Sequence, residues 1–305
     1  MMKDDQMAFE SALFARAAAT EVLLRQVLDA RPSSGEIERP ERLMAAMRHG
    51  VLNGGKRLRP FLVMESAALF SADGEAALRV AAALECVHCY SLIHDDLPSM
   101  DDDDLRRGQP TVHKAFDEAT AILAGDALLT LAFDIVADEA TALPAERRAA
   151  LVLALARAGG AGGMVGGQTL DLEAERKRPD EAGIIRLQAM KTGALIRFAC
   201  EAGAIVAGAS TADRERLAEF GSAIGLAFQL ADDLLDLTAD AAQMGKRTNK
   251  DAAAGKATLA ALHGPDWARE QLHGLIEQAH ALLDSYGERA ELLKAAATFV
   301  ATRNS

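Results

Sequence analysis

Apolar residues recur at spacings of three and four along almost the whole chain, and this periodicity predicts helices from one end to the other. Strand patterns are almost absent. Ser210 and Asp213 have the form of a capping box that begins a helix, and Gly287 is placed to end one. The pattern predicts an all-α fold, a single domain of roughly ten or more helices over residues 1–305. The expected helices cover residues 8–30, a segment after Pro40, 59–70, 75–94, 118–143, 144–158, 180–207, 210–237 and segments after Ala257 and Gly264.

The charge balance limits the classes of function. The chain has 33 basic and 45 acidic residues, a formal net charge of −12. Nucleic-acid binding needs a basic face that releases counterions from phosphates, so we expect no nucleic-acid partner. An acidic protein can still bind small phosphorylated ligands, because metal ions can bridge two sets of negative charges.

Cysteine content and hydropathy indicate the compartment. The 3 cysteines are too few for a disulfide framework and favour a reducing environment. The first residues lack the apolar core of a signal peptide, and no unbroken apolar run reaches the length of about 18 residues that favours a membrane span. We therefore expect a cytoplasmic protein with no membrane insertion. The glycine-rich run at 159–163 is interpreted as a turn or a close helix contact rather than a domain linker.

The segment from Asp95 to Asp104 holds an unusual concentration of acid, with aspartate at 95, 96, 101, 102, 103 and 104. Most charge runs are solvated loops, and so many like charges destabilise a fold unless a cation or solvent offsets them. This run, however, directly follows an apolar helical segment and contains the helix-disrupting Pro98. Asp95 and Asp96 are therefore expected at the end of a buried element.

A second acidic cluster lies at 232–236. Asp232 and Asp236 are four residues apart, so both project from one helix face, with Gln229 one turn earlier on the same side. A single pair of this kind is more often surface than ligand. Two clusters of the forms DDxxxxD and DDxxD instead indicate hard divalent cations such as Mg²⁺, which bind carboxylates and substrate phosphates together.

Basic residues accompany the acidic clusters. The segment GGKRLRP at 54–60 joins small residues to three cations, and Arg106 and Arg107 directly follow the aspartates. Alone, the glycine-containing segment is a weak phosphate signal, because it is neither a Walker loop nor a dinucleotide fingerprint. Together with KTG at 191–193 and GKR at 245–247, it indicates an anionic ligand bound with metals.

Taken together, these motifs resemble those of the bacterial trans-isoprenyl diphosphate synthases, most closely the farnesyl diphosphate synthases. The resemblance spans nearly the whole chain, and its paired aspartate motifs are highly specific. It implies an all-α barrel of helices around a deep central cavity and a homodimer. The motifs that carry it, in the family's order, are GGKRLRP at 54–60, SLIHDDLPSMDDDDLRRG at 91–108, GGQTLDL at 166–172, KTG at 191–193, FQLADDLLD at 228–236 and GKRTNKD at 245–251.

The resemblance also implies roles for the residues that match these motifs. Asp95, Asp101 and Asp232 are expected as ligands of three Mg²⁺ ions, for which Mn²⁺ can substitute, with Asp96 and Asp236 as close supporters, the latter through water. The allylic diphosphate is expected to be bound with help from Arg106, Lys191 and Lys246, while Thr192 and Gln229 direct oxygen dipoles toward the carbocation. Isopentenyl diphosphate is expected to be held without metal by Gly55, Lys56, Arg59, His88 and Arg107.

The reaction implied is a condensation in which the allylic diphosphate ionises and the double bond of isopentenyl diphosphate attacks the allylic cation. A proton is then lost to the released diphosphate, so no dedicated protein base is required. The family sets product length at the positions five and four before the first aspartate, here Tyr90 and Ser91. An aromatic at Tyr90 implies that dimethylallyl and geranyl diphosphates are extended to farnesyl diphosphate, with geranyl or geranylgeranyl diphosphate as alternative products.

Other classes account for parts of the chain. A non-catalytic subunit that modulates a prenyltransferase is the alternative class, although such subunits typically lose aspartates or arginines that this chain keeps. Terpene cyclases and head-to-head synthases share the acids but lack the GGKRLRP element. His94 and Asp95 match the HD phosphohydrolases, which need further histidines. Cys86 and Cys89 suggest zinc, but structural zinc needs four ligands, so two small core residues are favoured.

The chain departs from the family pattern at two places. Ala257–Ala260 stands where an aromatic and a proline are usual, and Ser305 stands where a terminal basic residue is common. The first departure concerns helix packing near the second aspartate cluster. The second concerns closure over isopentenyl diphosphate. Neither removes an expected metal ligand.

Overall fold

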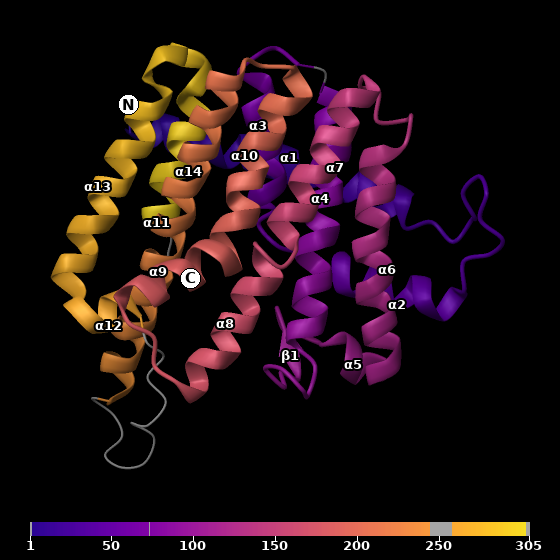
Figure 1. Ribbon diagram of the computed structural model, residues 1–305, viewed down its shortest axis with the longest axis horizontal. Coiled ribbons are helices and arrows are strands. Elements are labelled where there is room, and N and C mark those ends of the chain that lie inside the picture. The colour runs from indigo at the N-terminus through magenta and orange to yellow at the C-terminus, as the bar shows by residue number, and fades with distance from the viewer. Residues whose placement is uncertain (1, 73, 245–257, 303–305) are drawn as a thin grey trace. The chain divides into compact units, whose positions relative to one another are not determined.

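The computed structural model describes residues 2–72, 74–244 and 258–302, without the side chains of 2–5, 236 and 238–244. The chain forms two compact units: the first unit comprises residues 10–153 and 205–208, and the second comprises 1–9, 154–204 and 209–305. Figure 1 shows the helices in chain order. They are α1 (Met2–Val27), α2 (Glu41–Val51), α3 (Leu58–Ala68), α4 (Gly74–Asp95), α5 (Val112–Ala115), α6 (Glu118–Ala137), α7 (Ala145–Gly159), α8 (Met164–Arg176), α9 (Glu181–Gln188), the π-helical turn η1 (Ala189–Gly193), α10 (Ala194–Ala207), α11 (Thr211–Met244), α12 (Leu259–His263), α13 (Pro265–Leu283), the 3₁₀ segment η2 (Asp284–Ala290) and α14 (Glu291–Thr302).

The all-α fold is confirmed, and in the described residues the strands are limited to the short hairpin β1 (Leu105–Arg106) and β2 (Gln109–Pro110). The Ser210 cap is also confirmed, because its Oγ accepts a hydrogen bond from the backbone N–H of Asp213 at 3.1 Å. Gly287 interrupts the helical backbone with φ of 59°, as expected.

Three of the expected helix boundaries are wrong. Helix α6 ends at Ala137 rather than at residue 143, because Asp138 leaves the helical region and its carboxylate caps the N–H of Ala140 at 2.6 Å. The helix expected over 180–207 is divided by η1, and the one expected to end at residue 237 continues to Met244. Helix α8 was not among the expected helices. Of the Ala257–Ala260 departure, Leu259 and Ala260 are buried, while Ala257 and Ser305 lie outside the described residues.

Helix α4 is the core of the first unit. It is apolar on all sides, the pattern of a helix enclosed by others, and it packs against α2, α3 and α6 (Figure 1). Buried residues follow it from Ala76 to Ile93. Because the C-terminal end of α4 carries Asp95, a largely buried helix positions the first acidic cluster.

Three segments are long and apolar enough to cross a membrane by length and composition: Gly74–Asp95, Glu118–Ala137 and Ala145–Arg176. Protein covers 72% of the apolar window in the first of them, which accounts for its composition as a core helix. The window in α6 is only 44% buried and leaves the apolar side chains of Ile122 and Leu123 exposed.

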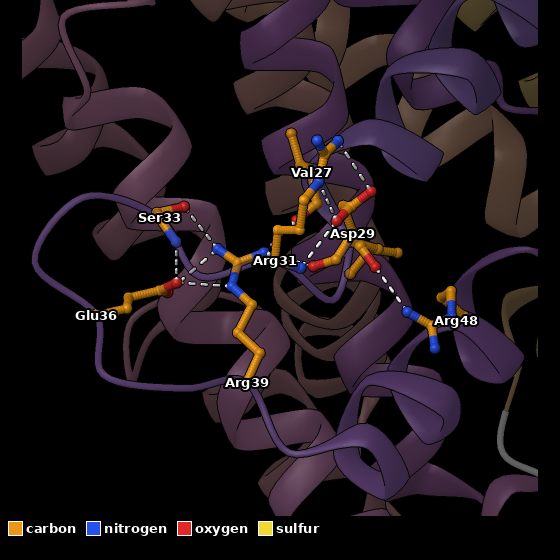
Figure 2. A network of polar contacts seen from close by, with 8 residues as sticks. Val27, Asp29, Arg31, Ser33, Glu36, Arg39 and Arg48 are labelled. Atoms are coloured by element: carbon orange, nitrogen blue, oxygen red, sulfur yellow. Dashed lines mark hydrogen bonds and ion pairs between the residues drawn. The ribbon is translucent and has the colours of Figure 1, made fainter.

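Arg39 holds the connection between α1 and α2 (Figure 2). Its guanidinium donates to the carbonyls of Val27 and Asp29 at 2.9 and 3.0 Å, and to the carboxylate of Glu36 at 2.7 and 3.1 Å. Arg48 donates to the carbonyl of Leu28 at 2.9 Å. The last carbonyls of a helix have no partner within it, so these contacts satisfy the end of α1 and fix where α2 begins.

The second unit is built around α11. This long helix packs against α13 and α14 on one side and against η1 on another. Phe9 from the start of the chain contacts Phe299 of α14, with ring centroids 5.1 Å apart. Helices α8 and α9 also pack against η1, so the π-helical turn is surrounded within this unit.

Candidate active site

The first acidic cluster forms a tight turn at the end of α4. The backbone N–H of Asp101 donates to the carbonyl of Asp95 at 2.8 Å, and that of Asp102 donates to Leu97 at 3.2 Å. Asp102 has the left-handed φ of 52°, which aspartate tolerates better than most residues. The turn therefore brings the backbones of Asp95 and Asp101 together, with Asp95 half-buried and Asp101 exposed.

Asp96 is buried and paired with Arg106 of β1. Arg106 Nε lies 2.8 and 2.9 Å from the two carboxylate oxygens, and Nη2 lies 2.5 Å from Oδ1. Burial raises the pKa of the Asp96 carboxyl, and the hydrogen bonds from Arg106 oppose that rise. This ion pair joins the acidic turn to the hairpin and orients Arg106.

Arg107 crosses from the hairpin to the GGKRLRP segment. Its guanidinium donates to the carbonyl of Gly54 and lies 3.3 Å from Asn53 Oδ1. Gly55 has φ of 126°, and a Cβ there would meet Arg107 Nη1 at 2.6 Å, so any side chain would clash with the guanidinium. Glycine at this position lets Arg107 approach the backbone.

Arg59 and His88 form a second basic contact in the same unit. Arg59 Nη1 lies 3.4 Å from His88 Nε2. Burial, reinforced by the charges of Arg59 and Arg107, lowers the pKa of His88 well below its usual value. The structure thus places Gly55 next to Arg107 and Arg59 next to His88, and it leaves Lys56 exposed.

In the second unit, Lys191 is presented by the π-helical turn η1. Its Nζ lies 2.5 Å from Asp171 Oδ2 of α8. A Cβ on Gly167 would lie 2.1 Å from the backbone nitrogen of Lys191, so glycine allows α8 to touch the turn. The ion pair with Asp171 and the close approach of Gly167, both on α8, therefore fix the position of Lys191.

Hydrogen bonds join the same turn to α11. Gln229 Nε2 donates to Thr192 Oγ1 at 3.0 Å. Gln188, which directly precedes the turn, donates to Asp233 Oδ2 at 3.0 Å. Asp232, the neighbouring residue, is half-buried on α11. Thr192 and Gln229 are therefore bonded directly, and Asp232 lies next in sequence to a residue that contacts Gln188.

Sequence reasoning missed several of these residues. Asp171, Gln188 and Asp233 hold the turn, and both amide atoms of Gln168 are buried without a hydrogen-bond partner. A buried polar group without a partner is a signal for a missing ligand. The motif GGQTLDL at 166–172 held Asp171 and Gln168, and it was the sequence signal that could have identified them.

The structure does not describe the side chains of two expected site residues. Lys246 lies outside the described residues, and so does the side chain of Asp236, although its backbone continues α11. Within the part of the chain that is described, no group of three or more acidic, histidine or cysteine side chains is arranged to hold a metal.

Tyr90 lies within α4 at 6% exposure, and its ring meets that of His94 edge-on with centroids 5.7 Å apart. Burial, followed by the charge of Asp95, raises the pKa of Tyr90 to about 12. Ser91 is half-buried, and its hydroxyl donates to the carbonyl of His88 at 2.8 Å. Cys86 and Cys89 are free and buried, as the core interpretation expects.

Known proteins have sequences and folds similar to those of this chain. The polyprenyl synthetase family matches residues 40–296. The chain is 46% identical to farnesyl diphosphate synthase from Escherichia coli, over 86% of this chain and 89% of that protein. It is 42% identical to geranylgeranyl pyrophosphate synthase 11 of Arabidopsis thaliana, over 88% and 77%. The crystal structure of an FPP/GFPP synthase from Zymomonas mobilis superimposes with a TM-score of 0.86 at 44% identity, covering 97% of this chain and 100% of that one.

These likenesses and the all-α fold define a prenyltransferase. The chain belongs to the polyprenyl synthetase family.

Proposed function

We propose that this prenyltransferase catalyses the head-to-tail (1'-4) condensation of isopentenyl diphosphate with dimethylallyl and then geranyl diphosphate, giving (2E,6E)-farnesyl diphosphate and diphosphate. The observation that carries the proposal is the pair of arginines Arg59 and Arg107, with His88 beside Arg59, in the same unit as the Asp95 turn. Identities of 46% and 40% to the farnesyl diphosphate synthases of Escherichia coli and Geobacillus stearothermophilus support it.

The donor set fits Mg²⁺. Asp95, Asp101 and Asp232 offer carboxylate oxygens, the ligands that hard cations prefer. Mg²⁺ is usually bound through one or two carboxylates plus substrate phosphates, so each site needs few protein ligands. We propose these residues as the ligands of three ions, with Asp96 and Asp236 as supporters. Bound there, Mg²⁺ would neutralise charge on the departing diphosphate.

The basic residues of the first unit would bind isopentenyl diphosphate without metal. Arg59 and Arg107 present guanidinium groups, which match phosphate oxygens, and Lys56 adds an exposed ammonium. His88 is neutral because its pKa is lowered by burial and by nearby arginines, so it can accept a hydrogen bond from Arg59.

The residues of the second unit would act on the allylic substrate. Lys191, oriented by Asp171, would bind its diphosphate, assisted by Arg106 and Lys246. Thr192 and Gln229 form a hydrogen-bonded pair whose oxygen dipoles would stabilise the allylic cation. The double bond of isopentenyl diphosphate would attack that cation, and the proton would leave to the released diphosphate. Exclusion of water would prevent capture of the cation.

Product analysis tests this proposal. With Mg²⁺, the purified protein is expected to convert isopentenyl and dimethylallyl diphosphates to a C15 diphosphate. With a chelator that removes the metal, it is expected to make no product, because the negative charge of the departing diphosphate is then not neutralised. Mass spectrometry identifies the products. A main product of C10 or C20 would retain the chemistry but contradict the assigned length. No product from folded protein would instead favour the non-catalytic partner subunit.

We also propose a homodimer in which α6 contributes to the interface. Ile122 and Leu123 are 45% and 58% exposed on this apolar helix, and exposed apolar faces are typical of interaction surfaces. Leu123→Glu is expected to give a monomer by light scattering, because burying a carboxylate in an apolar interface is costly. The control is Phe14→Glu on α1, which is 77% exposed and should leave the dimer intact. A dimeric Leu123→Glu protein would contradict this interface.

The extent of the domain and the cellular location are the remaining proposals. We propose that residues 1–305 form one polyprenyl synthetase domain, since a single family match over 40–296 includes residues of both units. We also propose a cytoplasmic enzyme that acts without membrane insertion or nucleic acid. The three buried, unbridged cysteines and the net charge of −12 support this assignment.

A further inference from the structure

Arg57 lies in the middle of the GGKRLRP segment, between residues proposed to bind isopentenyl diphosphate, but its own side chain is buried. Lys56 is exposed and Arg59 is half-buried, whereas Arg57 is only 4% exposed. Its backbone has the left-handed φ of 51°. A residue other than glycine holds that conformation only where its surroundings enforce it.

Three helices of the first unit meet at Arg57. Its guanidinium forms an ion pair with Glu85 of α4, in which the side chains are 2% and 3% exposed. It also donates to the carbonyl of Val51, the last residue of α2, at 2.6 Å. Its own carbonyl accepts a hydrogen bond from the N–H of Phe61 at 3.1 Å in the first turn of α3. Arg57 thus fixes the connection that carries Lys56 and leads into α3, where Arg59 lies.

Glu85 belongs to the same face of α4 as His88, three residues later, so this helix face contacts both arginines of the segment. Glu85 contacts Arg57 and His88 contacts Arg59. The two arginines are therefore held side by side against one rigid, buried helix. Displacement of Arg57 would be passed to Arg59 through two peptide units.

Stability alone does not account for this ion pair. Removing two charges from water is costly, and apolar residues of similar volume often serve a protein interior equally well. The pair does, however, restrict the backbone to one path. We infer that Arg57, held by Glu85, is a positioning residue that sets Lys56 and Arg59 for the diphosphate of isopentenyl diphosphate, an inference that rests on the proposed function.

The test replaces the whole pair, because a single substitution would leave a buried charge without a partner. The double variant Arg57→Met/Glu85→Leu is expected to fold, with a melting temperature close to wild type. Its KM for isopentenyl diphosphate should rise about tenfold or more, while its KM for geranyl diphosphate should stay within about twofold. An unchanged KM for isopentenyl diphosphate in this folded variant would overturn the inference, and so would an equal rise in both constants.

A control is another ion pair of this unit with a buried glutamate. Arg16 Nε lies 2.7 Å from Glu65 Oε1, and this pair joins α1 to α3 away from the segment. Arg16→Met/Glu65→Leu is expected to leave both KM values unchanged. If it raised the KM for isopentenyl diphosphate as much as the Arg57 variant, the effect would be general to the unit and the inference would be wrong.

Calorimetric titration with isopentenyl diphosphate alone separates this inference from the proposed function. Wild-type protein is expected to bind it, and Arg57→Met/Glu85→Leu to bind about tenfold or more weakly. A wild type that binds but makes no product would contradict the proposed function while leaving the inference supported by the affinity difference. Equal affinities in wild type and variant would contradict the inference while leaving product formation intact.

Discussion

Asp95→Asn is expected to lower kcat by about 10²- to 10³-fold, the range found when one stabilising group for transition-state charge is removed. Asparagine keeps the size of the side chain but loses the negative charge that a hard cation prefers. Asp95 is half-buried. Its backbone carbonyl accepts the hydrogen bond from the backbone N–H of Asp101, and the substitution leaves that bond in place. The turn should therefore survive, and the loss should be in chemistry rather than in folding.

Steady-state kinetics with geranyl and isopentenyl diphosphates, with Mg²⁺ varied, measure this effect. The matched control is Asp104→Asn in the same acidic run. The Asp104 side chain is 72% exposed and paired with Lys114 at 2.8 Å, so we expect kcat within about twofold of wild type. Equal losses in the two variants would show that the total charge of the loop matters, and would contradict a specific ligand role for Asp95.

The fold was predictable because helix formation is largely local. Spacings of three and four identify a helical face without knowledge of what covers it. The π-helical turn at Lys191 was not predictable, since it depends on residues distant in sequence. Gly167 approaches the backbone of Lys191, and Gly225 approaches that of Gly193, with a Cβ on Gly225 only 3.0 Å from the Gly193 Cα. No pattern within 180–207 contains that information.

The candidate site shows the same division. The acidic and basic motifs identified which residues carry charge, but they did not reveal how the charges pair. Asp96 was predicted as a supporter of metal ligands, and the structure pairs it with Arg106, which was predicted to assist the allylic diphosphate. Arg57 was overlooked, because a run of basic residues does not show which side chain is buried. Pairing and burial depend on tertiary contacts.

Tyr90→Ala is expected to change the main product from C15 to C20 or longer. The resemblance to the family places the floor of the chain-length channel at Tyr90 and Ser91. Tyr90 is 6% exposed on α4 and packs edge-on against His94, so its ring occupies a defined position in the core. Replacing a buried ring with a methyl group leaves a cavity, and an apolar cavity favours an apolar occupant such as a further isoprenoid unit.

Product distribution by mass spectrometry, with isopentenyl diphosphate in excess, checks this prediction. Tyr90→Phe keeps the ring and should retain C15, because the hydroxyl adds little to the volume that blocks growth. Tyr286→Ala is the second control: it removes the chain's other tyrosine, a side chain bound to Asp213 in the second unit, and should leave product length unchanged. If Tyr90→Ala still stops at C15, the ring does not set the length, and the limit must lie elsewhere in the channel.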